Sequence, residues 1–309
     1  MGQRAIAITT SNFNMENPLL EEFRSDGWDV VRSQYGRRLT EEEITGLLSD
    51  GEVTGMVAGV EPLTAAVFDA NPQLKAISRC GTGFDSVDLP AAEERGIVCV
   101  NTPQAPAAAV SEMTMAMILA ALRRIPQTDR RIREGTWKAE MGSLLSRRTV
   151  GVVGLGRVGR RVADLVSAFG ADVFYYDPLV ATAEYDRVLS VKELAASVDL
   201  LTIHTPLAPD TRNLISAEVI NALPDGAVVV NSARGGIMDE DALAAALASG
   251  RIDAAALDVF AEEPYTGPLC GFDNVVLTAH MGSYAKEARQ LMESEALLNL
   301  LNAVRKLEL

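Results

Sequence analysis

The chain contains two histidines, His204 and His280, and each follows a short apolar run at residues 200–203 or 274–278. Such runs are typical of buried strands. Imidazole exchanges a proton near neutral pH, so each histidine is a candidate general acid or base. Sequence position alone does not choose between them, and either could instead be a hydrogen-bonded structural residue.

Charged side chains follow two further apolar runs. Arg234 comes after residues 227–231 and is followed by two glycines, which leave room for a ligand. Asp258 ends the run at residues 254–257, and Glu263 comes shortly after it. Hydride transfer to or from a 2-hydroxy acid needs a cation for the carboxylate, a group that exchanges the hydroxyl proton, and a group that tunes it. All three residue types are present, although most arginines and acids in such positions are simply solvated.

A glycine-rich turn predicts a dinucleotide site. Residues 154–159 read Gly-Leu-Gly-Arg-Val-Gly, follow the strand-like run 150–153 and open a helical pattern. The glycines permit the tight turn, the approach of a pyrophosphate and the packing of helix on strand, while the helix N-terminus attracts the phosphates. The predicted contacts are Gly154, Gly156, Arg157, Val158 and Gly159.

A carboxylate completes this motif. Asp177 ends the next strand-like run, eighteen residues after Gly159, which is the context that a dinucleotide site requires. Asp177 would accept hydrogen bonds from the ribose hydroxyls and repel a 2′-phosphate, so NAD is favoured over NADP. A turn without a ligand, and a methyltransferase that uses S-adenosylmethionine, are the alternatives.

The elements that must position these residues form two series of strands and helices. The first occupies about a hundred residues, and the second begins at Thr149. This alternation predicts an α/β fold with two Rossmann-like or flavodoxin-like domains built on parallel sheets. A long helix at 108–124 joins them, and a final helix at 285–309 is free to cross back to the first. A cleft between two such domains is the expected ligand site.

Composition narrows the function classes. The 28 Lys and Arg residues against 42 Asp and Glu give a net charge of −14, which argues against nucleic acid as a partner. The three cysteines lack a CxxC pair and indicate neither a zinc site nor a disulfide framework. No signal pattern opens the chain, and the apolar stretch 113–122 is too short to span a bilayer. We expect a cytoplasmic protein without a metal or membrane partner.

Four segments resemble the D-isomer-specific 2-hydroxyacid dehydrogenase family, and its phosphoglycerate dehydrogenases in particular. They are residues 79–89, 231–236, 256–264 and 280–283. The resemblance implies that His280 is the acid/base, that Glu263 hydrogen-bonds it and favours its protonated form, and that Arg234 holds the substrate carboxylate. Asp258 would bind the nicotinamide carboxamide.

Further contacts follow from the same resemblance. It implies substrate contacts at Arg79, Gly81 and Gly83, and cofactor contacts at Thr82, His204, Thr205, Ser232, Ala233 and Gly282. It also implies a substrate-binding domain of residues 1–103 plus 285–309, with an NAD-binding Rossmann domain of residues 104–284 inserted in it, and a homodimer.

The substrate is the least determined point. The resemblance favours 3-phosphoglycerate and 3-phosphohydroxypyruvate, and Arg79 fits a phosphorylated acid. Glu61 stands in a stretch where these enzymes tend to carry an arginine for the phosphate, and its charge would oppose a dianion. Hydroxypyruvate and glyoxylate are therefore alternatives. A non-enzymatic NAD sensor of the corepressor kind is an alternative of another class.

Overall fold

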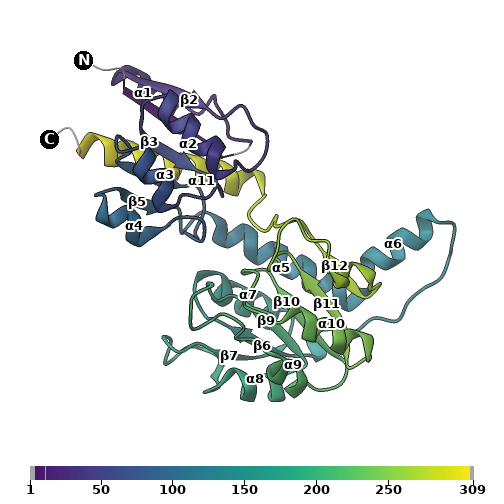
Figure 1. The fold of residues 1–309 in the computed structure, drawn as a ribbon. Coiled ribbons are helices and arrows are strands. Elements are labelled where there is room, and N and C mark those ends of the chain that lie inside the picture. The colour runs from purple at the N-terminus through teal and green to yellow at the C-terminus, as the bar shows by residue number, and fades with distance from the viewer. Residues whose placement is uncertain (1–3, 11, 307–309) are drawn as a thin grey trace. The chain divides into compact units, whose positions relative to one another are not determined.

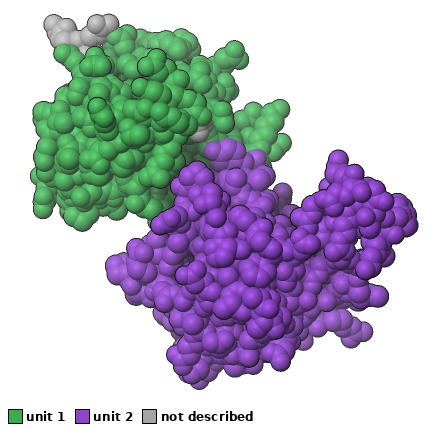
Figure 2. All heavy atoms as spheres, turned by 45° about the vertical axis from the view of Figure 1, so that its right-hand side comes forward, with its two compact units in different colours: residues 1–106, 285–309 green, residues 107–284 purple. Residues whose placement is uncertain are grey.

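The computed structural model describes residues 4–10 and 12–306. The chain divides into two compact units, Met1–Pro106 with Ala285–Leu309 and Ala107–Tyr284, which Figure 2 colours green and purple. Each unit contains one parallel sheet covered by helices, so the predicted α/β class is confirmed. The unit boundary after Pro106 lies close to the predicted domain boundary after residue 103. Residues 1–3 and 307–309, which the predicted substrate-binding domain includes, lie outside the described residues.

Unit 1 contains a five-stranded sheet in the order β2-β1-β3-β4-β5, of which Figure 1 labels β2, β3 and β5. Its strands are β1 Arg4–Ile8, β2 Trp28–Arg32, β3 Val53–Ala58, β4 Ala76–Arg79 and β5 Val98–Asn101. Its helices are α1 Leu19–Ser25, α2 Glu41–Asp50, α3 Ala65–Ala70, α4 Leu89–Glu94 and α11 Lys286–Lys306. Strand β5 was not predicted from the sequence, because it is a half-exposed edge strand whose residues lack a clear apolar pattern.

Helix α11 returns to unit 1 from the far end of the chain, as predicted. It packs on β3 and β4, and its Leu300 and Val304 side chains lie only 3.0 Å from where a Cβ on Gly55 would be. A larger residue than glycine in β3 would push the helix off the sheet. Packing of this kind explains why two segments more than two hundred residues apart form one unit.

Unit 2 contains a seven-stranded sheet in the order β12-β11-β10-β9-β6-β7-β8. Its strands are β6 Thr149–Val153, β7 Asp172–Tyr176, β8 Asp186–Arg187, β9 Leu200–Ile203, β10 Ala227–Asn231, β11 Ile252–Leu257 and β12 Val275–Leu277. Its helices are α5 Pro106–Arg123, α6 Ile125–Arg133, η1 Leu145–Arg147, α7 Arg157–Ala168, α8 Val191–Ser197, α9 Ala217–Ala222, α10 Glu240–Ala248 and η2 Pro268–Gly271.

The central strands of unit 2 are apolar along their whole length because helices cover both faces of the sheet. In β10, Val228 and Val230 pack in the cluster that includes residues of α5 and α7, whereas Ala227 and Val229 pack in the cluster with α8, α9 and α10. The strand order reverses at β6, which lies between β7 and β9. Ligands of open α/β sheets bind outside the carboxyl ends of the strands at such a reversal.

Helix α5 is long and apolar enough, by length and composition alone, to cross a membrane. Its Met117, Ile118 and Ala121 side chains are nevertheless buried in the core of unit 2, so it is a core helix. Helix α6 follows after Arg124, with Pro126 in its first turn, and projects from the body of the unit (Figure 1).

Candidate active site

The residues of unit 2 that were predicted to take part in the reaction follow the carboxyl ends of four neighbouring strands. His204 comes after β9, Arg234 after β10, Asp258 after β11 and His280 after β12. Because these strands are adjacent and parallel in the sheet, their ends line one edge of it. Tertiary structure thus gathers residues that are spread over 77 positions of the chain.

His280 and Glu263 form a hydrogen-bonded pair. The His280 Nδ1 atom lies 2.9 Å from Glu263 Oε2 and 3.1 Å from Oε1. Burial alone would raise the pKa of Glu263, but the hydrogen bond and charge of His280, the Phe260 N–H and the charge of Arg234 outweigh it and lower that pKa. The carboxylate is therefore ionised at neutral pH. Since Nδ1 faces Glu263, the Nε2 atom of His280 is the one left for a substrate, and 44% of the side chain is exposed.

Asn231 shapes the turn that carries Arg234. The Asn231 side chain, 2% exposed, donates through Nδ2 to the Arg234 carbonyl at 3.0 Å and accepts from the Ala233 N–H at 3.0 Å. The Arg234 guanidinium is half-buried and donates to the Ala233 carbonyl at 2.7 Å. Ser232 is tied to α5, since its hydroxyl lies 2.7 Å from that of Thr114. No role was predicted for Asn231 from the sequence, although asparagine is typical of turns closed by a side chain.

Gly235 allows the loop of Arg234 to touch the loop of Glu263. A Cβ at this position would lie 1.8 Å from the Phe260 carbonyl oxygen. We expect Gly235→Ala to destabilise the protein by about 1–3 kcal/mol, because overpacking displaces backbone here. It should also lower activity by moving Arg234 away from Glu263. Urea unfolding and steady-state kinetics measure both, with Gly271→Ala, where a Cβ meets nothing within 4 Å, as the matched control. Equal stability of the two variants would contradict this prediction.

Asp258 is buried at 1% exposed, below the loop that carries His280. The Thr278 hydroxyl donates to its Oδ1 at 2.6 Å. No role was predicted for Thr278, which follows β12 and is not part of the resembling segments. The Asp258 carboxylate thus contacts the loop that carries His280.

The glycine turn has the shape of a pyrophosphate cradle. Gly154 has a φ of +91°, and a Cβ on it would lie 2.9 Å from the His204 carbonyl. A Cβ on Gly159 would lie 1.9 Å from the Gly154 carbonyl oxygen. Gly156, by contrast, faces open space within 4 Å and caps α7. Two glycines are thus required by packing, and the third leaves free the space in front of the helix N-terminus, which fits a bound dinucleotide.

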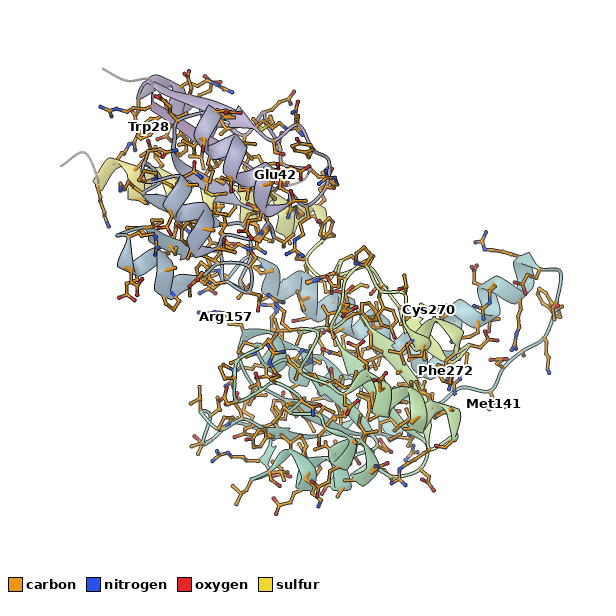
Figure 3. The ribbon with its side chains drawn as sticks, viewed as in Figure 1. Trp28, Glu42, Met141, Arg157, Cys270 and Phe272 are labelled. Atoms are coloured by element: carbon orange, nitrogen blue, oxygen red, sulfur yellow. The ribbon has the colours of Figure 1, made fainter. Side chains whose placement is uncertain are left out.

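Asp177 directly follows β7 beside this turn. Its Oδ2 accepts from the Leu155 N–H at 2.7 Å, and its Oδ1 from the Leu179 N–H at 2.8 Å. The carboxylate is half-buried and keeps acceptor capacity for ribose hydroxyls. Arg157, labelled in Figure 3, begins α7 and is exposed. These positions agree with a site for the adenosine half of a dinucleotide.

His204 differs from His280 in its surroundings. Burial lowers the pKa of His204 to about 3, so its ring is neutral at physiological pH. Its Nε2 atom lies 2.9 Å from the Thr202 hydroxyl, and its Nδ1 atom is buried without a hydrogen-bond partner among the described residues. A neutral ring held against the glycine turn is a poor proton donor near pH 7. Of the two histidines, His280 has the geometry of an acid/base.

Four predicted residues belong to unit 1: Arg79 ends β4, and Gly81, Thr82 and Gly83 follow it. Arg79 Nη1 donates to the Cys80 carbonyl at 2.5 Å. The N–H of Gly81 donates to the Thr102 hydroxyl at 2.9 Å and is buried. A substrate contact was predicted at Gly81, and its N–H is used within the fold by this hydrogen bond to Thr102. Gly83 and the exposed Thr82 stay predictions.

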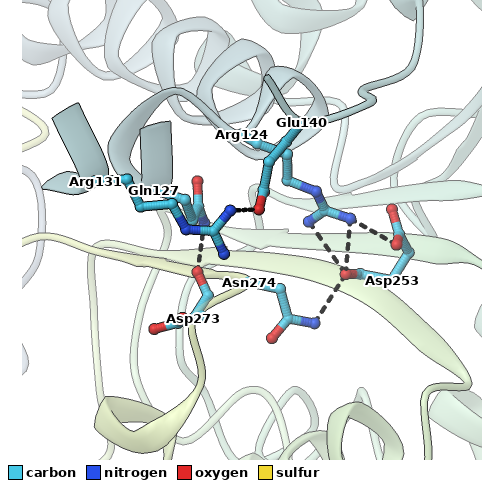
Figure 4. Close-up of a pocket in the computed structure, with 7 residues that line it drawn as sticks. All are labelled: Arg124, Gln127, Arg131, Glu140, Asp253, Asp273 and Asn274. Carbon is cyan, nitrogen blue, oxygen red and sulfur yellow. Dashed lines mark hydrogen bonds and ion pairs between the residues drawn. The ribbon is translucent and has the colours of Figure 1, made fainter. Parts of the chain in front are cut away.

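A cavity of about 240 Å³ lies elsewhere in unit 2 (Figure 4). It is at the opposite, amino-terminal end of β11 and β12, and its arginines are paired with acids, Arg124 with Asp253 and Arg131 with Glu140. It is lined by Arg124, Gln127, Arg131, Glu140, Asp253, Asp273 and Asn274. Among the described residues, no group of His, Cys, Asp and Glu side chains could hold a metal ion.

Comparison with known proteins identifies the family of the chain. Residues 115–282 match the model of the D-isomer specific 2-hydroxyacid dehydrogenase, NAD binding domain. The D-3-phosphoglycerate dehydrogenase of Methanocaldococcus jannaschii is 42% identical over 282 residues, which are 89% of this chain and 54% of that protein. The chain thus spans about half the length of the curated relatives it matches.

Solved structures are similar over nearly the whole chain. The TT0316 protein from Thermus thermophilus is 34% identical with a TM-score of 0.89, covering 97% of each chain. A glyoxylate reductase from Paecilomyes thermophila is 28% identical with a TM-score of 0.88, covering 99% of this chain and 97% of the other. The whole described fold is therefore shared with these proteins, including both units.

Proposed function

Because the chain belongs to the D-isomer-specific 2-hydroxyacid dehydrogenase family, we propose that it moves a hydride between NAD and C2 of a small D-2-hydroxy or 2-keto acid. The observation that carries this proposal is the His280–Glu263 pair, with Nε2 of His280 left for a substrate. Arg234 lies close enough to lower the pKa of Glu263. A cation, a proton donor and its orienting carboxylate are thus held at one edge of the sheet.

Each side chain has a defined task in the reduction of a keto acid. Arg234 binds the substrate carboxylate and polarises the C2 carbonyl, for which its planar fork is suited. His280 gives a proton from Nε2 to the keto oxygen, and Glu263 holds the ring through Nδ1 and stabilises its charged form. When bound, the nicotinamide supplies the hydride. In the reverse direction His280 takes the proton from the hydroxyl.

The first test is a panel of candidate substrates. Purified protein with NADH is mixed in parallel with 3-phosphohydroxypyruvate, hydroxypyruvate, glyoxylate and pyruvate, and the absorbance of NADH is followed. We expect NADH to be consumed with at least one of them. Binding of NADH without turnover of any 2-keto acid would contradict the proposal and favour an NAD sensor, whereas binding of S-adenosylmethionine and not NADH would favour a methyltransferase.

Coenzyme choice is a separate prediction. We expect NADH to be preferred over NADPH by roughly 100-fold in kcat/KM, because like charges brought together cost several kcal/mol and Asp177 places a carboxylate beside the glycine turn. Asp177→Asn removes the charge and keeps most of the side chain, so the preference should shrink. Steady-state kinetics with both coenzymes measure this. A wild-type enzyme that uses both equally would contradict the role given to Asp177.

For the substrate we propose 3-phosphoglycerate and 3-phosphohydroxypyruvate first, on the strength of the phosphoglycerate dehydrogenase relatives. Glu61 weakens this choice less than its charge suggests. It is 1% exposed, and its carboxylate accepts from the Thr9 hydroxyl and, at 3.0 Å, from the Gly59 N–H. The likeness to a glyoxylate reductase keeps unphosphorylated acids as the second candidate. The same panel separates the two.

We further propose a cytoplasmic homodimer. Trp137, Met141 and Leu144 are 91%, 93% and 59% exposed on the segment that follows α6, and apolar side chains that together form an exposed patch mark association surfaces. Light scattering after size-exclusion chromatography tests the assembly. A monomeric mass at micromolar concentration would contradict it.

A further inference from the structure

We infer that Asp258 is a positioning residue that fixes the backbone of His280, and this inference rests on the proposed role of His280. The backbone of His280 has a φ of +49°, in the left-handed region that residues other than glycine rarely occupy. Such a conformation persists only where the surrounding structure holds it. The loop of residues 278–282 must therefore contain the contacts that do so.

Asp258 supplies those contacts from below the loop. Its Oδ1 accepts from the Met281 N–H at 2.8 Å, besides the Thr278 hydroxyl. Its Oδ2 accepts from the Gly282 N–H at 2.7 Å. Its own carbonyl accepts from the His280 N–H at 2.8 Å. Hydrogen bonds thus reach the loop before, at and after His280, all from one buried residue.

Glycine at position 282 is part of the same arrangement. A Cβ there would lie 3.0 Å from Asp258 Oδ2, so a larger residue would separate the loop from the carboxylate. The Asp258 carboxylate uses three of about four acceptor positions on this loop. The loop therefore occupies most of the hydrogen-bonding capacity of this carboxylate, and about one acceptor position remains for the nicotinamide.

The consequence for the reaction is geometric. The ring of His280 reaches Glu263 only while the backbone at 280 keeps its left-handed turn. If the turn relaxes to an ordinary φ, the side chain leaves Glu263 and the proton donor is misplaced. A displacement of about 1 Å in a catalytic group can cost on the order of 100-fold in rate.

Asp258→Asn tests this inference. The amide keeps the size of the side chain but turns one acceptor into a donor, which then opposes the Gly282 N–H or its neighbours. We expect kcat to fall on the order of 100-fold while the dissociation constant of NADH, measured by fluorescence, changes little. The 13Cα and 13Cβ chemical shifts of His280 should leave the left-handed range. Labelling the histidines alone gives two sets of signals, and His280→Ala assigns them.

Two further variants complete the design. Asp253→Asn, at the other end of β11 and paired with Arg124, controls for loss of a carboxylate and should keep the His280 shifts. Thr278→Val removes only the hydroxyl donor, so it stands in if Asp258→Asn does not fold, with smaller changes in the same direction. Unchanged His280 shifts in both Asp258→Asn and Thr278→Val would overturn the inference. So would loss of NADH binding with kcat intact at saturating NADH.

The two proposals can fail separately. If the wild-type protein reduces no 2-keto acid, the proposed function fails, and the carbon shifts of His280 still decide whether Asp258 holds its backbone. If the wild type is active and the shifts of Asp258→Asn are unchanged, only the positioning role fails.

Discussion

Replacing His280 by alanine is expected to lower kcat for keto-acid reduction by about 10²–10⁴-fold, the range that a positioned general acid contributes. The coenzyme should still bind, because the glycine turn and Asp177 lie at other strands of the sheet. Stopped-flow measurement of NADH oxidation and of NADH binding separates the two effects. Added imidazole should restore part of the rate if only the proton donor is missing.

Glu263→Gln is the matched comparison for His280→Ala. Glutamine keeps a hydrogen bond to Nδ1 but no charge, so a smaller loss of kcat is expected. The lowered pKa of Glu263 means that its carboxylate stays ionised below its ordinary 4.5. Its stabilising contribution is present above that pH and is lost only as pH falls through the lowered value. An acid limb assigned to Glu263 above pH 5 would contradict this account, as would full activity of His280→Ala.

Arg234→Ala should have the second large effect. We expect kcat/KM for the keto acid to fall by about 10²–10³-fold, because loss of one partner of a desolvated charge pair costs 2–5 kcal/mol. NADH affinity should be unchanged. Arg234→Lys should recover only part of the loss, since an ammonium cannot form the bidentate contact of the guanidinium. Steady-state kinetics over a range of keto-acid concentrations measure all three enzymes.

Arg130→Ala provides the control for Arg234→Ala. Arg130 is an exposed arginine of α6 that pairs with Asp273 at 2.7 Å, at the amino-terminal end of the strands. Its removal changes the net charge by the same amount without touching the proposed site. If both variants behaved alike, the effect of Arg234 would be one of overall charge, and the carboxylate of the substrate would have to be held by another group.

Much of the fold and the coenzyme motif could be predicted because their signals are local. Apolar runs of strand length can be recognised within a few residues, and the glycines at 154, 156 and 159 and the acid at 177 follow a fixed spacing along the chain. The edge strand β5 was not predicted because residues of an edge strand bury too little of their surface to require an apolar pattern. The pairing of His280 with Glu263 was predicted from the resemblance and not from spacing, since the two residues are seventeen positions apart on loops that follow different strands.

The sequence by itself thus determined the class of fold, the dinucleotide turn and the residue types available for hydride transfer. Only the tertiary structure decided the surroundings of the two histidines. Burial lowers the pKa of His204, whereas the side chain of His280 is 44% exposed and hydrogen-bonded to Glu263. It also decided the hydrogen bonds of Asn231 and Asp258, and those of Asp258 to the loop of His280 form only once the ends of β11 and β12 are side by side. Hydrogen bonds and burial depend on neighbours in space, and the sequence order of residues does not state which neighbours those are.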